Sequence, residues 1–220
     1  MKIALISIPT PTFNNRGAAS ALPYHIIKGA GDKAEFEVWS YNSNHVSADE
    51  VEETERALGV RIHIMRQPRW MAWMFRLHLA VLRAALRYPY LRYLRLRDKA
   101  LASIHDYAPD MVWIYGEETA CFARFFPDIP CVVTMPDCES LHYHRLLGKD
   151  FATLSLPQVM RYAVAFWQYR GMERDMRRYK ATFHFVGRQD AAFFCEVCPE
   201  AKVVFLPHPL YAHRDKAIRF

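Results

Sequence analysis

The chain has 220 residues, enough to bury one large hydrophobic core or at most two small ones. Hydrophobic residues make up 52% of it and charged residues 24%, which excludes an intrinsically disordered chain. Its formal net charge of +6 suits nucleic acid, anionic lipid or phosphorylated substrates, and does not choose among them.

The apolar residues predict strands that alternate with helices along the chain. We predict strands at residues 3–8, 36–41, 60–65, 111–115 and 131–135, and two more within residues 178–190 and 201–210. We predict helices at residues 17–29, 48–58, 71–87, 90–107, 117–125, 140–147 and 158–179, with a short helix before the last strand. Ser47 and Glu50 have the spacing of a capping box that opens the second helix.

This alternation predicts a doubly wound α/β fold, in which a mostly parallel sheet carries helices on both faces. Ligands of such sheets bind beyond the carboxyl ends of the strands. The loops expected to form a ligand site are therefore residues 9–16, 115–118, 136–140 and 187–190. The first apolar run is too short for a signal peptide and no run of 18 apolar residues occurs, so we expect a cytoplasmic protein without a membrane span.

The first loop offers a candidate anion site. It lacks the glycine patterns of a dinucleotide-binding turn and of a P-loop. Asn15, Arg16 and Gly17 precede the predicted helix, whose free amides would favour an anionic substrate group. The alternative is a plain strand-to-helix turn in which Arg16 is solvated.

Two later loops carry carboxylates. Asp137 follows a buried strand and could accept a hydrogen bond from a substrate hydroxyl or act as a weak base. The alternative is that Asp137 or Ser140 caps the following helix. Glu117 could contact a substrate hydroxyl, or it could favour the positive end of its own helix.

The end of the chain resembles a known family. Residues 178–190 form a strand, a polar turn and a helix start, and residues 201–210 form a strand with a proline-rich exit. This order resembles the end of the N-terminal domain of GT-B glycosyltransferases, where strands end in "vSexD" and "iPNGvd". The segment from Pro136 to Leu141 is similar to the "hD..S" segment of the retaining GT4-type enzymes. Pro136, Gly187 and His208 depart from the family's His, Ser and Asn.

The resemblance implies one Rossmann-like, acceptor-binding domain at residues 1–210, with an interdomain linker or tail beginning at 211–220. A nucleotide-sugar donor would be held chiefly by a missing C-terminal domain, in cis or in trans, without cofactor or metal. The reaction would be hexosyl transfer to a sugar or lipid-linked acceptor, as in bacterial surface polysaccharide synthesis, and the chain alone would be inactive. Asp137 is the catalytic candidate, and the substrate-binding candidates are Asn15, Arg16, Gly17, Glu117, Glu139, Ser140 and Arg188.

Residues 66–99 contain nine Lys or Arg and a single acid, Asp98. The seven-residue spacing of Arg69, Arg76 and Arg83 predicts one helical stripe, continued by Arg87. Arg92, Arg95 and Lys99 repeat at helical spacing after Pro89. Basic stripes beside Trp70 and Trp73 are typical of a helix lying in an anionic membrane surface. The alternative is a packed helix pair with a solvated basic face, and no nucleic-acid motif accompanies the charge.

Two other hypotheses remain open. The chain could be a complete, non-catalytic membrane-docking subunit that joins a separate donor-binding chain. It could also be a flavodoxin-like binding protein, whose phosphate loop Thr10 and Thr12 match only weakly.

Overall fold

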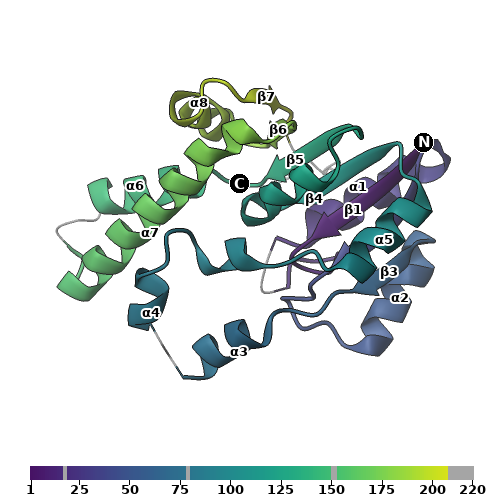
Figure 1. Ribbon diagram of the computed structural model, residues 1–220, viewed down its shortest axis with the longest axis horizontal. Helices are drawn as coiled ribbons and strands as arrows, with labels where there is room; N and C mark the ends of the chain where they lie inside the picture. Colours follow the sequence, from purple (N-terminus) through teal and green to yellow (C-terminus); the bar gives the residue numbers. More distant parts are fainter. Residues whose placement is uncertain (17–18, 78–79, 150–152, 208–220) are drawn as a thin grey trace, which may run out of the picture.

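The computed structural model describes residues 1–16, 19–77, 80–149 and 153–207. Its centre is a seven-stranded sheet in which all neighbouring strands run parallel (Figure 1). The strands are β1 (Lys2–Ser7), β2 (Glu35–Ser40), β3 (Arg61–Ile64), β4 (Met111–Tyr115), β5 (Cys131–Met135), β6 (Thr182–Phe185) and β7 (Lys202–Phe205). Their spatial order is β3-β2-β1-β4-β5-β6-β7, so the predicted doubly wound α/β fold is confirmed.

Helices cover both faces of the sheet. They are α1 (Ala21–Ala30), α2 (Ala48–Leu58), α3 (Arg69–Arg76), α4 (Ala80–Ala84), α5 (Asp98–Tyr107), α6 (Glu139–Lys149), α7 (Leu156–Asp175) and α8 (Arg188–Val197). Short 3-10 helices are η1 (Gly31–Lys33), η2 (Tyr90–Tyr93), η3 (Glu117–Phe125) and η5 (Met176–Arg178). None of the helices in the described part of the chain combines the length and hydrophobicity that crossing a bilayer would require.

Alternation along the central strands divides the core into two layers. In β1, Ile3 and Leu5 pack with α1 and α2, whereas Ala4 and Ile6 face the layer formed by α5, η3, α7 and α8. Successive side chains of a strand point to opposite faces, and a strand buried on both faces is apolar throughout. The continuous apolar runs of β1 and β4 therefore place these strands at the centre of the sheet.

The segment of residues 66–99 differs from its prediction. Instead of one helix at 71–87, the structure has α3 and the separate helix α4, so Arg69, Arg83 and Arg87 do not share one helical stripe. The side chain of Arg76 lies outside the described residues.

The predicted helix at residues 90–107 is also wrong in its first half. Only the turn η2 and helix α5 are helical, and the chain between them is extended. Leu94 and Leu96 are buried while Arg95 and Arg97 are exposed, which is the two-residue period of an extended segment. Burial of these two leucines thus overrides the helical spacing of Arg92, Arg95 and Lys99.

Candidate functional site

The candidate site lies at the carboxyl edge of the sheet. From β1 the chain builds outward in one direction through β2 and β3, and then in the other direction from β4 to β7. The loops after β1 and β4 therefore diverge at the point where the strand order reverses, which is where parallel sheets bind ligands. The loops after β5 and β6 follow along the same edge.

The loop after β1 is tied into its surroundings. The Asn15 Oδ1 accepts a hydrogen bond from the Ala21 amide at 3.0 Å, and Arg16 pairs with Glu50 at the start of α2. The expectation that helix α1 begins at residue 17 is wrong, because the helix begins at Ala21. Asn15 accepts the hydrogen bond of the Ala21 amide, the first free amide of the helix. Gly17 lies outside the described residues. Arg16 remains half exposed, but its charge is engaged by Glu50.

The loop after β5 separates an exposed carboxylate from a buried network. Asp137 is exposed directly beyond the strand, whereas Ser140 is fully buried. The Ser140 amide donates to Glu173 of α7 at 3.0 Å, and the Ser140 hydroxyl donates to the same carboxylate. The first turn of α6 is thus capped by a side chain from another helix, and Ser140 holds α7 in place instead of facing a substrate.

Four glutamates gather behind Asp137. Glu117 and Glu118 begin η3 after β4, Glu139 begins α6 after β5, and Glu173 comes from α7. Glu117 is 3% exposed and neither carboxylate oxygen has a hydrogen-bond partner among the described residues. The sequence offered Glu117 as a substrate contact or as an acid at the positive end of its helix; in the structure it begins η3 and its side chain is buried.

The environment of these acids favours their protonated forms. Burial, followed by the charges of Glu118, Asp137 and Glu173, raises the pKa of Glu139 to about 7. Burial and the neighbouring glutamates hold the pKa of Glu117 well above its usual range, and burial also raises the pKa of Glu173. The site can therefore hold protons at neutral pH beside Asp137, a feature typical of sites that perform acid–base chemistry.

Tyrosines form one wall of this region. The Tyr169 hydroxyl donates to the Glu118 Oε1 at 3.1 Å, and the Tyr143 ring stacks on Tyr169 with centroids 5.7 Å apart. Tyr162 continues the row at 5.9 Å from Tyr143. Sequence reasoning missed these tyrosines as well as Glu118 and Glu173, because they meet only through the packing of α7 on α6. Of these missed residues, only Glu173 stands out in the sequence, because it is an acid in a predicted helix rich in arginine and aromatic residues.

The turn after β6 supports the same loop. The Asp190 Oδ1 accepts a hydrogen bond from the Cys138 amide at 3.1 Å, so this acid braces the loop that carries Asp137. A side chain at Gly187 would bring its Cβ within 2.1 Å of the Asp190 Oδ2, so glycine leaves room for the Asp190 carboxylate at this position. Arg188 is exposed and its guanidinium lies over the Phe205 ring, 5.5 Å from the centroid.

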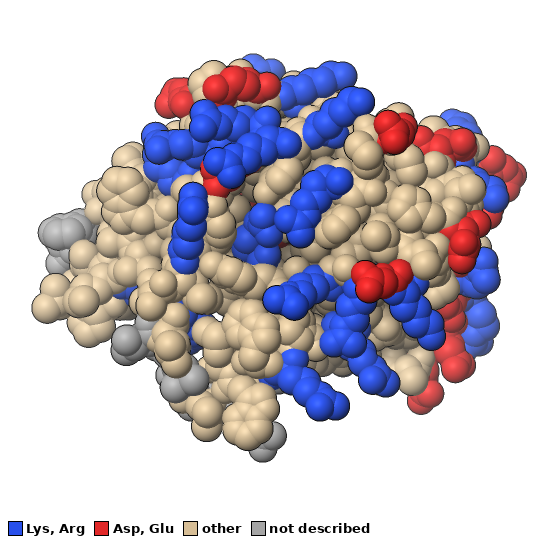
Figure 2. Space-filling model, in the orientation of Figure 1, with Lys and Arg blue, Asp and Glu red and all other residues tan. Residues whose placement is uncertain are grey.

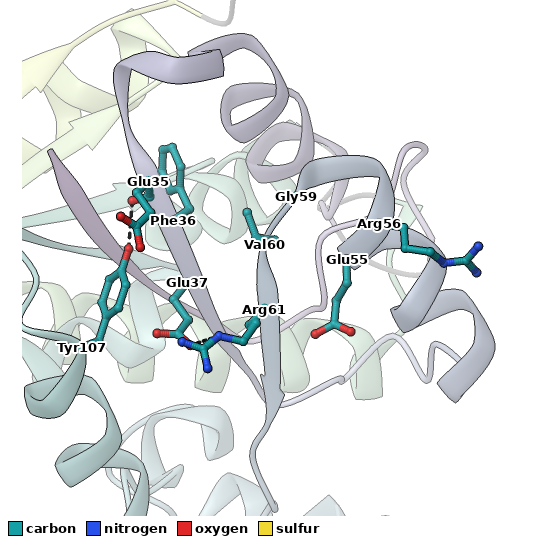
Figure 3. Close-up of a pocket in the computed structure, with 9 residues that line it drawn as sticks. All are labelled: Glu35, Phe36, Glu37, Glu55, Arg56, Gly59, Val60, Arg61 and Tyr107. Atoms are coloured by element: carbon teal, nitrogen blue, oxygen red, sulfur yellow. Dashed lines mark hydrogen bonds and ion pairs between the residues drawn. The ribbon is translucent and has the colours of Figure 1, made fainter.

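A hollow of about 420 Å³ occupies the opposite edge of the sheet, near the amino ends of β2 and β3 (Figure 3). Its polar groups already bond one another: the Tyr107 hydroxyl donates to the Glu35 carbonyl at 3.1 Å, and Arg61 pairs with Glu37 at 2.9 Å. Since ligands of parallel sheets bind at the carboxyl edge, we interpret this hollow as structural. Among the described residues, no cluster of three or more His, Cys, Asp or Glu is arranged to hold a metal ion.

The residues predicted to meet a membrane lie on α3, on α4 and just after α4. Trp70 and Trp73 are exposed on α3, with Trp73 at 60%. Arg83 lies in α4, and the backbone carbonyl of that residue accepts from the Gln168 side chain at 2.9 Å, which joins α4 to α7. Arg87 lies 3.6 Å from the Asp175 carboxylate.

No protein-family model matches the chain, and no curated protein matches its sequence. A solved sucrose-phosphate synthase from Thermosynechococcus elongatus is similar in structure, with a TM-score of 0.55 and 10% sequence identity over 94% of this chain and 47% of that one. A UGT transferase from Siraitia grosvenorii, solved in complex with UDP, gives a TM-score of 0.43 and 8% identity over 92% of this chain and 50% of that one. The chain thus spans about half the length of these structures. The first likeness supports the Rossmann-like α/β fold.

Proposed function

We propose that the chain is the acceptor-binding half of a nucleotide-sugar-dependent glycosyltransferase of the GT-B class, closest to the retaining GT4-type enzymes. The observation that carries this proposal is the carboxyl-edge site, where exposed Asp137 stands in front of acids that hold protons at neutral pH. The structural likeness to one half of sucrose-phosphate synthase supports the fold that this function requires.

In this proposal Asp137 accepts a hydrogen bond from the acceptor hydroxyl and serves as a weak base. Glu139 lies behind it in a mostly protonated form below pH 7, so the negative charge near the acceptor stays low. The row of tyrosines formed by Tyr143, Tyr162 and Tyr169 offers ring faces and hydroxyls beside the same carboxylates. Aromatic and carboxylate groups together suit a polar ring with many hydroxyls, as in a sugar acceptor.

The donor belongs to a second domain, in cis or in trans. Asn15 and Arg16 lie in the loop after β1 and Arg188 begins α8, so both segments follow strands whose carboxyl ends face the candidate site. Arg188 is the exposed cation that would meet a donor phosphate. We infer that the described chain alone binds acceptor and transfers no sugar.

We further propose that α3, α4 and the part of α7 from Leu156 to Trp167 dock on an anionic membrane. The exposed apolar side chains there are Trp70, Trp73, Leu77, Leu82, Leu156, Met160 and Trp167. Figure 2 shows no acidic side chain over α3 and α4 on this face, whereas Lys and Arg lie nearby. Apolar anchors beside cations favour a surface rich in anionic lipid. The acceptor would then be a lipid-linked glycan at the cytoplasmic face, as in bacterial surface polysaccharide synthesis.

The function is tested with Asp137→Asn in the protein together with its donor-binding partner, supplied with labelled nucleotide sugars and lipid-linked acceptors. We expect transfer to fall by roughly 10²-fold or more. Asp128→Asn is the control, since Asp128 is also an exposed acid and lies in the loop that precedes β5. Unchanged transfer by Asp137→Asn, or robust transfer by the 220 residues alone, would contradict the proposal.

Docking is tested by sedimentation with vesicles. We expect the chain to bind vesicles containing phosphatidylglycerol and not neutral ones, and Trp73→Ser/Trp167→Ser to remove the binding. Leu206→Ser, an exposed apolar residue after β7, should bind like the wild type. Equal binding to anionic and neutral vesicles would count against an electrostatic docking surface, and replacing Arg76, Arg83 and Arg87 by Glu should abolish the preference.

A further inference from the structure

A cavity of about 550 Å³ lies beside the edge strand β3, away from the acidic site. Four cationic side chains line it, and they come from three segments: Arg66 after β3, Arg95 and Arg97 in the extended segment before α5, and Lys99 in the first turn of α5. Figure 2 shows Lys and Arg gathered on the face where β3, α3 and the start of α5 meet.

The extended segment creates this convergence. Because Leu94 and Leu96 point into the core, Arg95 and Arg97 must both point outward on the same side of the chain. In a continuous helix these two arginines would lie about 200° apart around the axis. The departure from helical structure is therefore what brings two guanidinium groups to one cavity.

The positive charge of the cavity has no internal counterion. None of the ten residues that line it is acidic. Across the described residues, none of the four cationic side chains makes an ion pair or a hydrogen bond. The buried acid Glu37, which contacts the lining residue His63, is already bonded by the Arg61 Nε and the His63 Nε2, each at 2.9 Å. Asp98 lies in the first turn of α5 and is not among the lining residues. Four like charges held together in this way favour an anion between them.

The floor of the cavity is apolar and aromatic. Trp39 is 1% exposed and stacks on His63 with ring centroids 5.0 Å apart, and Met65 is buried next to them. The Trp39 Nε1 has no hydrogen-bond partner among the described residues. A buried aromatic floor below a cationic rim distinguishes this cavity from a solvated basic surface. Its volume falls within the range of small-ligand sites, roughly 300–1,000 Å³.

We propose that this cavity binds a ligand through a phosphate or diphosphate group. Guanidinium groups match phosphate oxygens with paired N–H donors, so Arg95 and Arg97 hold the group while Arg66 and Lys99 complete its neutralisation. Arg66 lies three residues before α3, so the bound phosphate lies close to the proposed docking surface. The inference concerns binding only and goes beyond the proposed transfer reaction.

The test is calorimetric titration of the chain with inorganic pyrophosphate at low ionic strength. We expect saturable binding that Arg95→Gln/Arg97→Gln weakens by roughly tenfold or more, because both paired donors are lost. Lys33→Gln/Arg174→Gln removes the same charge from exposed positions outside the cavity and should change the affinity by less than about twofold. Equal weakening in both variants, or no saturable binding to the wild type, would overturn the proposal.

A second arm identifies the source of the phosphate. Vesicles containing phosphatidic acid, a phosphomonoester, are compared with phosphatidylglycerol vesicles of matched charge. A preference for phosphatidic acid that is lost in Arg95→Gln/Arg97→Gln indicates a lipid headgroup, whereas pyrophosphate binding without this preference indicates a soluble ligand. Trp73→Ser/Trp167→Ser should retain pyrophosphate binding, so a failure of membrane docking is distinguishable from a failure of the cavity.

Discussion

The acidic site and the basic cavity differ in where their ionisable side chains lie: the acids are buried and the bases are exposed. The glutamates after β4 and β5 pack inside the protein together with Glu173 of α7, and burial raises the pKa of Glu117, Glu139 and Glu173. The arginines that line the basic cavity are exposed, and they make no ion pair among the described residues. Buried acids thus make the stability of one region depend on pH, while exposed bases leave stability almost unaffected and are available for ligands.

The comparison is tested most strongly at Glu173. Glu173→Ala would leave the buried Ser140 amide and hydroxyl without an acceptor and would open a cavity between α6 and α7. We expect the free energy of unfolding to fall by about 3 kcal/mol. Urea denaturation measures the change, with Glu196→Ala on the exposed side of α8 as control. A loss no larger than that of the control would mean that the buried network does not stabilise the fold.

Gly187→Ala tests the brace on the other side of the same loop. The new methyl group would displace Asp190 from the Cys138 amide, because it would come within 2.1 Å of the Asp190 Oδ2. We expect a destabilisation of about 1–2 kcal/mol in thermal or urea unfolding. Gly29→Ala is the matched change, since nothing lies within 4 Å of that position in α1 and alanine favours a helix. If both changes raised the free energy of unfolding, the Asp190 side chain would move away from the new methyl group without loss of stability, which would contradict the prediction.

The pH dependence of stability sharpens the comparison. Glu139 has a pKa of about 7 in the folded protein and 4.5 as its ordinary value. The folded state therefore binds more protons between these values, and stability falls as pH rises from about 4.5 to about 7. Glu139→Gln removes this dependence. The difference in unfolding free energy between variant and wild type should therefore be more favourable to the variant at pH 8 than at pH 4, by roughly 1–2 kcal/mol once solvent screening is allowed for. Parallel pH profiles for variant and wild type would contradict the raised pKa.

The basic cavity should show the smallest effect. Arg95→Gln/Arg97→Gln removes exposed charges that have no ion pair in the described structure, so we expect a change in unfolding free energy of no more than about 0.5 kcal/mol without ligand. Differential scanning calorimetry would measure it. A large destabilisation would mean that these arginines serve the fold and not a ligand.

Much of the fold was predictable from sequence. The buried strands β1, β4 and β5 were found from their apolar runs, and the capping box of Ser47 and Glu50 is present as predicted. The prediction failed where local spacing and tertiary packing disagree. The basic residues within 90–107 are spaced as on a helix. Leu94 and Leu96 are nevertheless buried in the core, and the chain is extended there.

Less of the candidate site could be predicted. Asp137 and Glu139 were found because the fold itself implies that residues after β5 lie at the ligand-binding edge. Glu173 was missed because only the packing of α7 brings it to the Ser140 amide, 33 residues away in sequence. Arg95 was predicted only as part of a basic helical stripe, and Arg97 was not singled out. Their common cavity depends on an extended segment, which the helical spacing of the charges does not indicate.

The pairing of β1 with β4 also bears on how the chain folds during synthesis. Ile3 pairs with Met111, so one edge of β1 finds its partner only after residues 65–110 have followed β3. At ~5–20 residues per second this interval lasts on the order of 2–10 s. During that time β1–β3 can form a half-sheet whose apolar edge is open, and such edges pair readily with other chains. Nascent chains halted in this interval should therefore need chaperone protection more than chains halted after β7, in which every interior strand has both neighbours.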